Sequence, residues 1–173
     1  MRIIAGTRKG HTIQAPRGRD TRPTSDRVRE NVFNILGSVE GASVLDLYAG
    51  SGALGLEALS RGAAHATFVD SDRDAVRAIE QNLDRLRLRA TVLQRDAVQL
   101  LAAETRKYDL VLVDPPYAMY TEIEPKLARY LPAVLAGDGV LVVETDAGTQ
   151  PELPFAERTS RRYGSVRVTV FDR

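Results

Sequence analysis

The sequence of 173 residues contains no cysteine and only two histidines. Without cysteine the chain forms no disulfide, binds no metal through thiolates and has no cysteine nucleophile. His11 and His65 lie far apart and lack the spacing of metal ligands, so we expect no metal. No apolar run approaches the ~20 residues of a membrane helix, and residues 1–8 lack the apolar stretch of a secretory signal. We therefore expect a cytoplasmic protein that does not span a membrane.

The sequence also has little net charge, +1, but this charge is unevenly distributed. Residues 1–29 hold eight Lys and Arg against two Asp, which gives +6 there and −5 over the other 144 residues. A basic segment suits a polyanionic partner, because binding to phosphates releases counterions. The alternative is a solvated segment without a partner. We divide the chain into a basic N-terminal arm or hairpin, residues 1–25, and one domain, residues 26–173.

Strand and helix patterns alternate from residue 43 onward. Strands are predicted over 43–48, 66–70, 91–93, 109–114, 139–144, 156–163 and 165–171. Helices are predicted over 53–60, 72–86, 97–104 and 121–135, the last with a break before Pro132, and another begins at Ser25 or Asp26 and ends by Gly37. This alternation predicts an α/β protein with a mostly parallel, seven-stranded sheet, helices on both faces and a C-terminal antiparallel hairpin.

Acidic residues stand where four successive strands end, or just beyond. They are Asp46, Asp70, Asp96 and Asp114. Because ligands of such sheets bind at the carboxyl ends of the strands, this placement predicts a binding site rather than scattered surface charge.

A glycine-rich loop, Gly50-Ser51-Gly52-Ala53-Leu54-Gly55, follows the first strand. Glycines let the backbone approach a ligand closely, but the pattern by itself also fits an ordinary turn. In a dinucleotide enzyme the loop faces a pyrophosphate and Asp70 holds a ribose. With S-adenosylmethionine, Asp46 suits the cationic methionine end, Asp70 the ribose hydroxyls, and Asp96 with the Ala97 amide the adenine. Both hypotheses explain Asp70, but only the second gives Asp46 and Asp96 a role.

The segment Asp114-Pro115-Pro116-Tyr117 ends the fourth strand. Two prolines stiffen the turn and have no N–H donors, which leaves carbonyl oxygens free to accept hydrogen bonds. Asp114 and the Pro115 carbonyl can each take one N–H of an exocyclic amine, which orients the nitrogen toward a methyl donor. Tyr117 can stack on the target base. The alternative is a rigid turn with a buried tyrosine.

The run Val44–Gly52 followed by Asp114-Pro115-Pro116-Tyr117 resembles class I S-adenosylmethionine-dependent methyltransferases that act on exocyclic amines. The stretches 47–63 and 22–36 are similar to the RsmD family, which methylates the N2 amine of one guanine in 16S ribosomal RNA. The resemblance extends from Arg2 to the hairpin at Gly164. It implies a Rossmann-like fold with S-adenosylmethionine as the cofactor and the small ribosomal subunit as the partner.

The resemblance also implies roles for individual residues. The cofactor set is Asp46, Tyr48, Gly50, Ser51, Gly52, Asp70, Asp96 and Ala97. The catalytic set is Asp114, Pro115, Pro116 and Tyr117. The arm is expected beside the site, with Lys9, Arg17, Arg19 and Arg22 gripping RNA phosphates. Many exocyclic-amine enzymes have Asn at the first motif position, where this chain has Asp114.

Other functions fit parts of the pattern. The same chemistry permits transfer to adenine N6 in DNA or to a protein glutamine amide, although no target-recognition domain for DNA is evident. A nicotinamide-linked oxidoreductase would use the glycine loop but leaves Asp46 without a role, and a non-catalytic RNA-binding module would use only the arm. Nothing in the pattern requires a dimer, and we expect a monomer.

Overall fold

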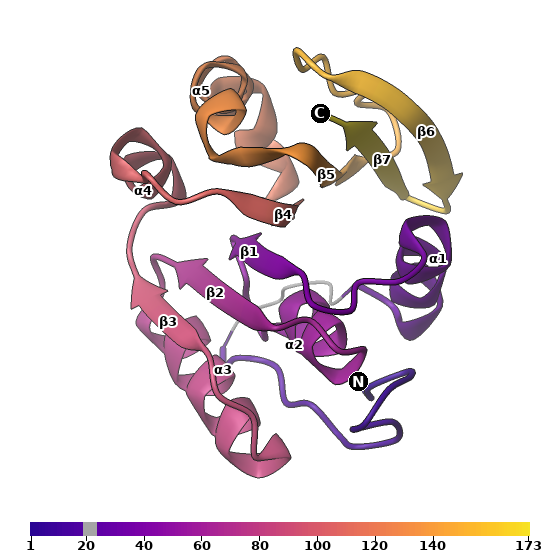
Figure 1. Ribbon diagram of the computed structural model, residues 1–173, viewed down its shortest axis with the longest axis vertical. Helices are drawn as coiled ribbons and strands as arrows, with labels where there is room; N and C mark the ends of the chain where they lie inside the picture. The colour runs from indigo at the N-terminus through magenta and orange to yellow at the C-terminus, as the bar shows by residue number, and fades with distance from the viewer. Residues whose placement is uncertain (19–23) are drawn as a thin grey trace.

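The computed structural model describes residues 1–18 and 24–173 (Figure 1). The strands are β1 (Ser43–Leu47), β2 (His65–Asp70), β3 (Thr91–Gln94), β4 (Tyr108–Val113), β5 (Leu135–Asp146), β6 (Ala156–Tyr163) and β7 (Val166–Asp172). The helices are α1 (Asp26–Leu36), α2 (Ala53–Ser60), α3 (Arg73–Leu86), α4 (Ala97–Ala103) and α5 (Tyr120–Val134), with a 3₁₀ turn η1 (Tyr117–Met119) before α5. None of the helices in this part of the chain is long and apolar enough to cross a bilayer.

The strands form one seven-stranded sheet in the order β3-β2-β1-β4-β5-β7-β6. Strands β1 to β5 pair in parallel, and β7 pairs antiparallel with both β5 and β6. The closing hairpin therefore places β7 inside the sheet and β6 at its edge. The predicted α/β fold, its parallel sheet and its antiparallel C-terminal hairpin are confirmed.

Helices cover both faces of the sheet (Figure 1). Side chains alternate between the faces along a strand, so β1 sends Val44 to one core and Leu45 to the other. Residues of α1, α2 and α3 share the first core, and residues of α4 and α5 share the second. Because both faces are covered, the central strands read as continuous apolar runs.

The predicted break before Pro132 is wrong, because α5 continues through Pro125 and Pro132 to Val134. Each proline removes one backbone hydrogen bond. Burial of the apolar stripe of this helix, which includes Leu127 and Leu131, compensates for that loss. Strand β5 also begins earlier than predicted, at Leu135, and its pairing with β4 shifts register between Tyr108 and Leu110.

The first 18 residues form a small hairpin that packs on the body of the protein. An isolated bridge joins Arg2 to Thr12, and Ile3 and Ile13 are each only 2% exposed within the first core. The backbone N–H groups of Ile4 and Ala5 donate to the Glu57 carboxylate of α2 at 2.9 and 3.0 Å. These contacts fix the described part of the arm against α2.

Arg29 ties the arm to α1 and α2. Its side chain is fully buried, donates to the Arg2 carbonyl and pairs with Asp26 at 3.0 Å and Glu57 at 3.5 Å. Such a cation lies inside a protein only when nearby acceptors replace its hydration. Arg29, through Arg2, Asp26 and Glu57, therefore holds the start of the chain, α1 and α2 together.

Replacing Arg29 with Ala is expected to lower the free energy of unfolding by about 3–5 kcal/mol, because it removes a buried cation from its carboxylate partners. Urea denaturation followed by circular dichroism measures this loss. Arg27→Ala is the matched control, since Arg27 is an exposed arginine of the same helix. Equal stability of the two variants would contradict a structural role for Arg29.

Candidate active site

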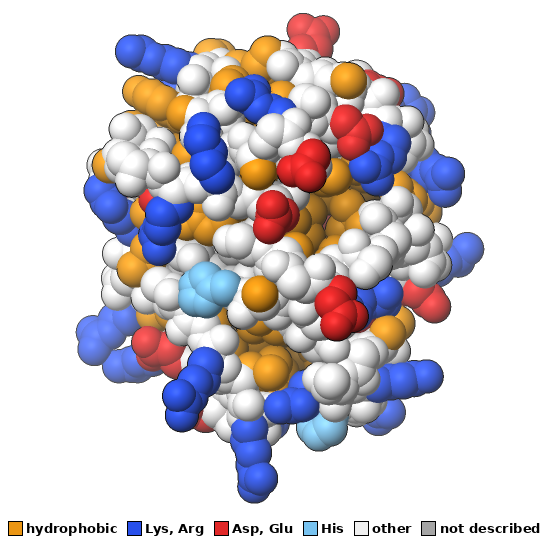
Figure 2. Space-filling model, in the orientation of Figure 1, with side chains coloured by type: hydrophobic (Ala, Val, Ile, Leu, Met, Phe, Trp, Pro, Cys, Tyr) orange, Lys and Arg blue, Asp and Glu red, His pale blue; other side chains and the backbone are white. Residues whose placement is uncertain are grey.

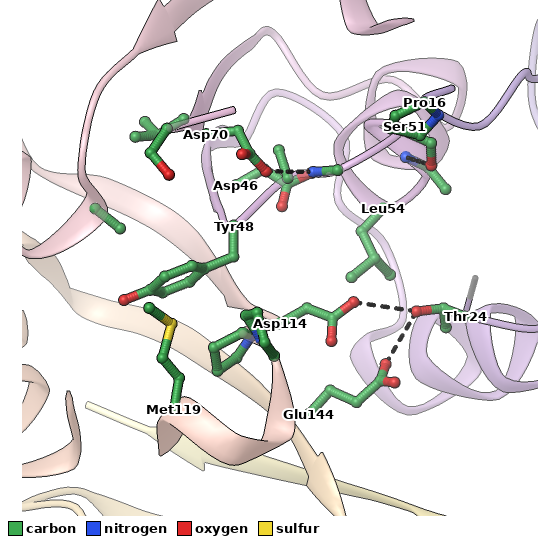
Figure 3. Close-up of a pocket in the computed structure, with 18 of the residues that line it drawn as sticks. Pro16, Thr24, Asp46, Tyr48, Ser51, Leu54, Asp70, Asp114, Met119 and Glu144 are labelled. Carbon is green, nitrogen blue, oxygen red and sulfur yellow. Dashed lines mark hydrogen bonds between the residues drawn. The ribbon is translucent and has the colours of Figure 1, made fainter. Parts of the chain in front are cut away.

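A cavity of about 400 Å³ opens at the carboxyl edge of the parallel strands (Figure 3). Eleven of the twelve residues predicted for the cofactor and for catalysis line it. They are Asp46, Tyr48, Gly50, Ser51, Asp70, Asp96, Ala97, Asp114, Pro115, Pro116 and Tyr117. Gly52 is the exception, because it is buried behind the loop at the start of α2. The volume lies in the range of small-molecule sites.

Strand register explains why the acidic side chains converge. Asp46 pairs with Phe68 on β2, two residues before Asp70, so Asp46 and Asp70 point to the same face of the sheet. Asp46 also pairs with Leu112 on β4, two residues before Asp114. The acids at the ends of three adjacent strands are therefore neighbours on one face.

The glycine loop is held by these same acids. The Gly50 N–H donates to Asp70 Oδ2 and the Asp72 N–H donates to Asp70 Oδ1, each at 2.9 Å. The Gly55 N–H donates to Asp46 Oδ2 at 2.9 Å. Each carboxylate oxygen can accept a second hydrogen bond, so both Asp46 and Asp70 can still accept a hydrogen bond from a ligand.

Asp46 is almost completely buried on β1. Burial raises the pKa of its carboxyl to about 8, against a smaller lowering by the Gly55 N–H and a further raising by the nearby charge of Asp70. A buried acid with so high a pKa favours a cationic ligand, because a positive charge beside it restores the ionised form. This property fits the cationic methionine end of S-adenosylmethionine.

Gly55 lies where α2 crosses the sheet. A Cβ on this residue would come within 2.4 Å of the Phe68 ring and 3.0 Å of Asp46 Oδ2. The absence of a side chain therefore lets α2 approach β2 and lets the Gly55 N–H reach Asp46.

Gly55→Ala is expected to lower the free energy of unfolding by about 1–3 kcal/mol, because the added methyl overpacks the contact with Phe68. Thermal or urea denaturation measures the change. Gly137→Ala serves as the control, since a Cβ at Gly137 meets nothing within 4 Å. A Gly55→Ala protein as stable as the control would contradict this close packing.

Tyr48, which follows β1, and Asp96, which precedes α4, also line the cavity. Tyr48 has a φ of 57°, which is costly for a residue with a side chain, and its ring points into the cavity (Figure 3). Asp96 caps α4 by accepting from the Gln99 N–H at 2.9 Å. Burial, with the charge of Asp96, raises the pKa of Tyr48 to about 12, so its hydroxyl stays protonated at neutral pH.

The predicted amine corner contains two residues that the sequence did not assign to the site. Thr24 Oγ1 lies 3.2 Å from Asp114 Oδ2 and 3.1 Å from Glu144 Oε2 (Figure 3). Tyr117 Oη donates to Glu144 Oε1 at 3.2 Å. Burial raises the pKa of both Asp114 and Glu144, and the charge of Glu144 raises that of Asp114 further. Glu144 ends the predicted fifth strand, so the strand-end rule that selected the other acids could have found it.

The proposed RNA-contacting cations are only partly described. Lys9 and Arg17 are exposed, whereas Arg19 and Arg22 lie outside the described residues. Arg8 donates to the carbonyls of Leu86 and Arg87 and so helps to anchor the arm. Lys and Arg side chains surround much of the face in Figure 2, with several acidic side chains nearer its centre and others at its edge. Within residues 1–18 and 24–173, no group of three or more His, Asp or Glu side chains is arranged so that it could hold a metal ion.

The fold and the cavity together define a class I methyltransferase architecture. Residues 1–172 match the family model described as conserved hypothetical protein 95. The chain is 41% identical to the YlbH protein of Bacillus subtilis (strain 168) over 99% of this chain and 98% of that protein. The chain therefore belongs to this family, the RsmD methyltransferases that its motifs resemble. S-adenosylmethionine is the methyl donor of their class.

Two further relatives come from Escherichia coli. The chain is 44% identical to the ribosomal RNA small subunit methyltransferase D of strain K12, over 68% of this chain and 60% of that protein. The solved structure of the yhhF protein has a TM-score of 0.86 at 34% identity, covering 100% of this chain and 97% of that one. The likeness to yhhF therefore extends through the arm and the C-terminal hairpin.

Proposed function

We propose that this protein transfers a methyl group from S-adenosylmethionine to the exocyclic N2 amine of a guanine in 16S ribosomal RNA of the small subunit. The observation that carries the proposal is one cavity that holds both the acid–glycine edge and the Asp114-Pro115-Pro116-Tyr117 corner. The relatives named ribosomal RNA small subunit methyltransferase D support the choice of RNA. The basic arm supports it as well, because its cations suit phosphates.

Residues along the β1–β3 edge are proposed to hold the cofactor. Asp46 pairs with its cationic amine, Asp70 accepts from its ribose hydroxyls, and Asp96 accepts from its adenine amino group. The Ala97 N–H, at the start of α4, donates to an adenine ring nitrogen. When bound, S-adenosylmethionine supplies a methyl carbon made electrophilic by the sulfonium.

The β4 end is proposed to position the amine. Asp114 and the Pro115 carbonyl each accept one N–H, so the nitrogen lone pair faces the methyl carbon, and Tyr117 stacks on the base. As the nitrogen–carbon bond forms, the carbon–sulfur bond breaks with its electron pair moving to sulfur. The nitrogen becomes cationic, and the Asp114 carboxylate stabilises that charge until the extra proton passes from the nitrogen to water.

The arm is proposed to hold the RNA backbone at the mouth of the cavity. Lys9 and Arg17 contact phosphates together with Arg19 and Arg22, which positions the substrate without selecting its sequence. The target guanine must be unpaired or flipped, because its N2 is hydrogen-bonded inside a helix.

Nucleoside analysis of the product tests this proposal. Purified protein, labelled S-adenosylmethionine and undermethylated small subunits or naked 16S RNA are incubated, and the RNA is digested to nucleosides. We expect N2-methylguanosine at a single position. Methylated adenine in DNA or methylated glutamine in protein, without N2-methylguanosine, would instead establish the alternative acceptors.

A further inference from the structure

Glu144 lies beside the amine corner but has no part in the proposed transfer. The last matched pair between the adjacent parallel strands β4 and β5 is Val113 with Val143. The next residues, Asp114 and Glu144, therefore stand side by side with their backbones about 4.8 Å apart, the usual spacing of neighbouring strands, and their side chains point to the same face of the sheet. Both line the cavity, and in Figure 3 both side chains point toward Thr24.

The Glu144 side chain is held in a fixed position. It is 6% exposed, Tyr117 Oη donates to its Oε1 at 3.2 Å, and Thr24 Oγ1 lies 3.1 Å from its Oε2. One threonine hydrogen serves one carboxyl at a time, so the three-group contact is most favourable when Asp114 and Glu144 share a proton on the oxygens that face Thr24, which leaves Glu144 Oε1 an acceptor. The raised pKa values of both acids agree with this sharing.

A carboxylate that has accepted two hydrogen bonds can still accept more. Its two oxygens offer about four acceptor sites, and Tyr117 and Thr24 occupy two of them. An acceptor buried in this way requires a donor from whatever fills the cavity, because water is then displaced. The base that binds between Asp114 and Glu144 therefore has to present two neighbouring donors along one edge.

The Watson–Crick edge of guanine is such an edge, because N1–H and one N–H of the 2-amine point in the same direction. Adenine presents a bare N1 acceptor next to its 6-amine. We propose that Glu144 selects guanine by accepting the N1–H hydrogen bond while Asp114 holds the N2 amine. A purine without a hydrogen on N1, such as adenine, would place the N1 lone pair against a lone pair of the Glu144 oxygen, and the two would repel each other. The proposal rests on the proposed guanine-N2 activity and assigns a specificity residue to the same site.

A base analogue tests the proposal without any change in the protein. Once the modified nucleotide is mapped, RNA is prepared with guanine or 2-aminopurine at that position. 2-Aminopurine keeps the 2-amine but has no hydrogen on N1. We expect wild-type protein to methylate the analogue at least about tenfold more slowly in kcat/KM, since one hydrogen bond to a charged group is lost.

The Glu144→Gln variant isolates the contact. A glutamine amide can donate to a bare N1, so the ratio of guanine to 2-aminopurine rates should fall by about fivefold or more relative to wild type. The oxygen at C6, which 2-aminopurine also lacks, affects both proteins alike and cancels in this comparison. Glu80→Gln, the same change on the exposed surface of α3, should keep the wild-type ratio. Melting temperature and S-adenosylhomocysteine affinity, both expected near wild type, show that the Glu144 variant is folded.

The outcomes separate the two proposals. Equal wild-type rates on guanine and 2-aminopurine would overturn the role of Glu144, provided that N2-methylguanosine is the product. A ratio that Glu144→Gln leaves unchanged would overturn it as well. If a Glu144→Gln preparation does not fold, the wild-type comparison alone decides. Failure to form N2-methylguanosine on any RNA would instead remove the proposed function itself.

Discussion

Asp114→Ala is expected to reduce the kcat for methyl transfer by about 10²–10³-fold while S-adenosylhomocysteine still binds with near wild-type affinity. Alanine removes the carboxylate that is proposed to orient the amine and to stabilise the charge developing on it, and both effects would act mainly in the transition state. Asp114 lies on the β4 side of the cavity, across from the residues proposed to hold the cofactor. Single-turnover transfer of labelled methyl groups measures the rate, and calorimetry measures the binding.

Two further variants show what Asp114 does. Asp114→Asn keeps an acceptor oxygen but no charge, so it should retain more activity than Asp114→Ala if orientation is the larger effect. Asp138→Ala, at an exposed position in β5, should be fully active. Unchanged turnover in Asp114→Ala would remove this residue from the mechanism.

Asp46→Asn is expected to make the free protein more stable and to weaken cofactor binding. In the free protein, ionised Asp46 is a buried charge, and asparagine relieves its desolvation while keeping an oxygen for the Gly55 N–H. The same change removes the carboxylate proposed to pair with the methionine amine. We expect affinity for S-adenosylhomocysteine to fall about 10- to 100-fold at pH 8.

The sign of the pH dependence follows from the raised pKa. The unfolded chain releases the Asp46 proton near 3.8, whereas the folded protein keeps it until about pH 8. Between these values folding takes up a proton, so this residue lowers the free energy of unfolding as the pH rises, and its effect is constant above about pH 8. The stability gain from Asp46→Asn should therefore grow toward pH 8 and reach on the order of a few kcal/mol.

Binding should show the opposite trend. Because ionised Asp46 is proposed to hold the cation, wild-type affinity for S-adenosylhomocysteine should rise up to tenfold per pH unit below about 8, and Asp46→Asn should lack this dependence. Urea titrations and calorimetry at several pH values provide the measurements. Asp84→Asn, on the exposed surface of α3, is the matched control. A wild-type affinity independent of pH would contradict the assignment of Asp46 to the methionine amine.

Much of the fold was predictable because local patterns and global topology agree. Apolar runs such as 110–113 favour central strands, and the alternation of strands with helices favours a parallel sheet. Acids at strand ends then converge wherever register allows, which is why Asp46, Asp70 and Asp114 line one cavity. Proline positions were less informative about where helices end, since tertiary packing keeps α5 helical through two prolines that would normally end a helix.

The contacts that the sequence did not reveal join segments far apart in the chain. Thr24 meets Asp114 and Glu144, which lie 90 and 120 residues further on. No periodicity or motif reports such a meeting. Likewise the basic composition of residues 1–18 hid the burial of Ile3 and Ile13, so a segment with the charge of a free arm is in fact part of the core.

The acid-rich floor of the cavity also constrains how a nucleic acid can approach. Five carboxyl groups, those of Asp46, Asp70, Asp96, Asp114 and Glu144, line the cavity, and those that are ionised repel phosphodiesters, while neutral bases and cationic groups meet no such barrier. We therefore expect a polynucleotide chain to stay at the rim, near the docked hairpin, and to present one nucleotide base-first. Electrostatic repulsion at depth and attraction at the rim would together orient the strand before any atom of the target is recognised.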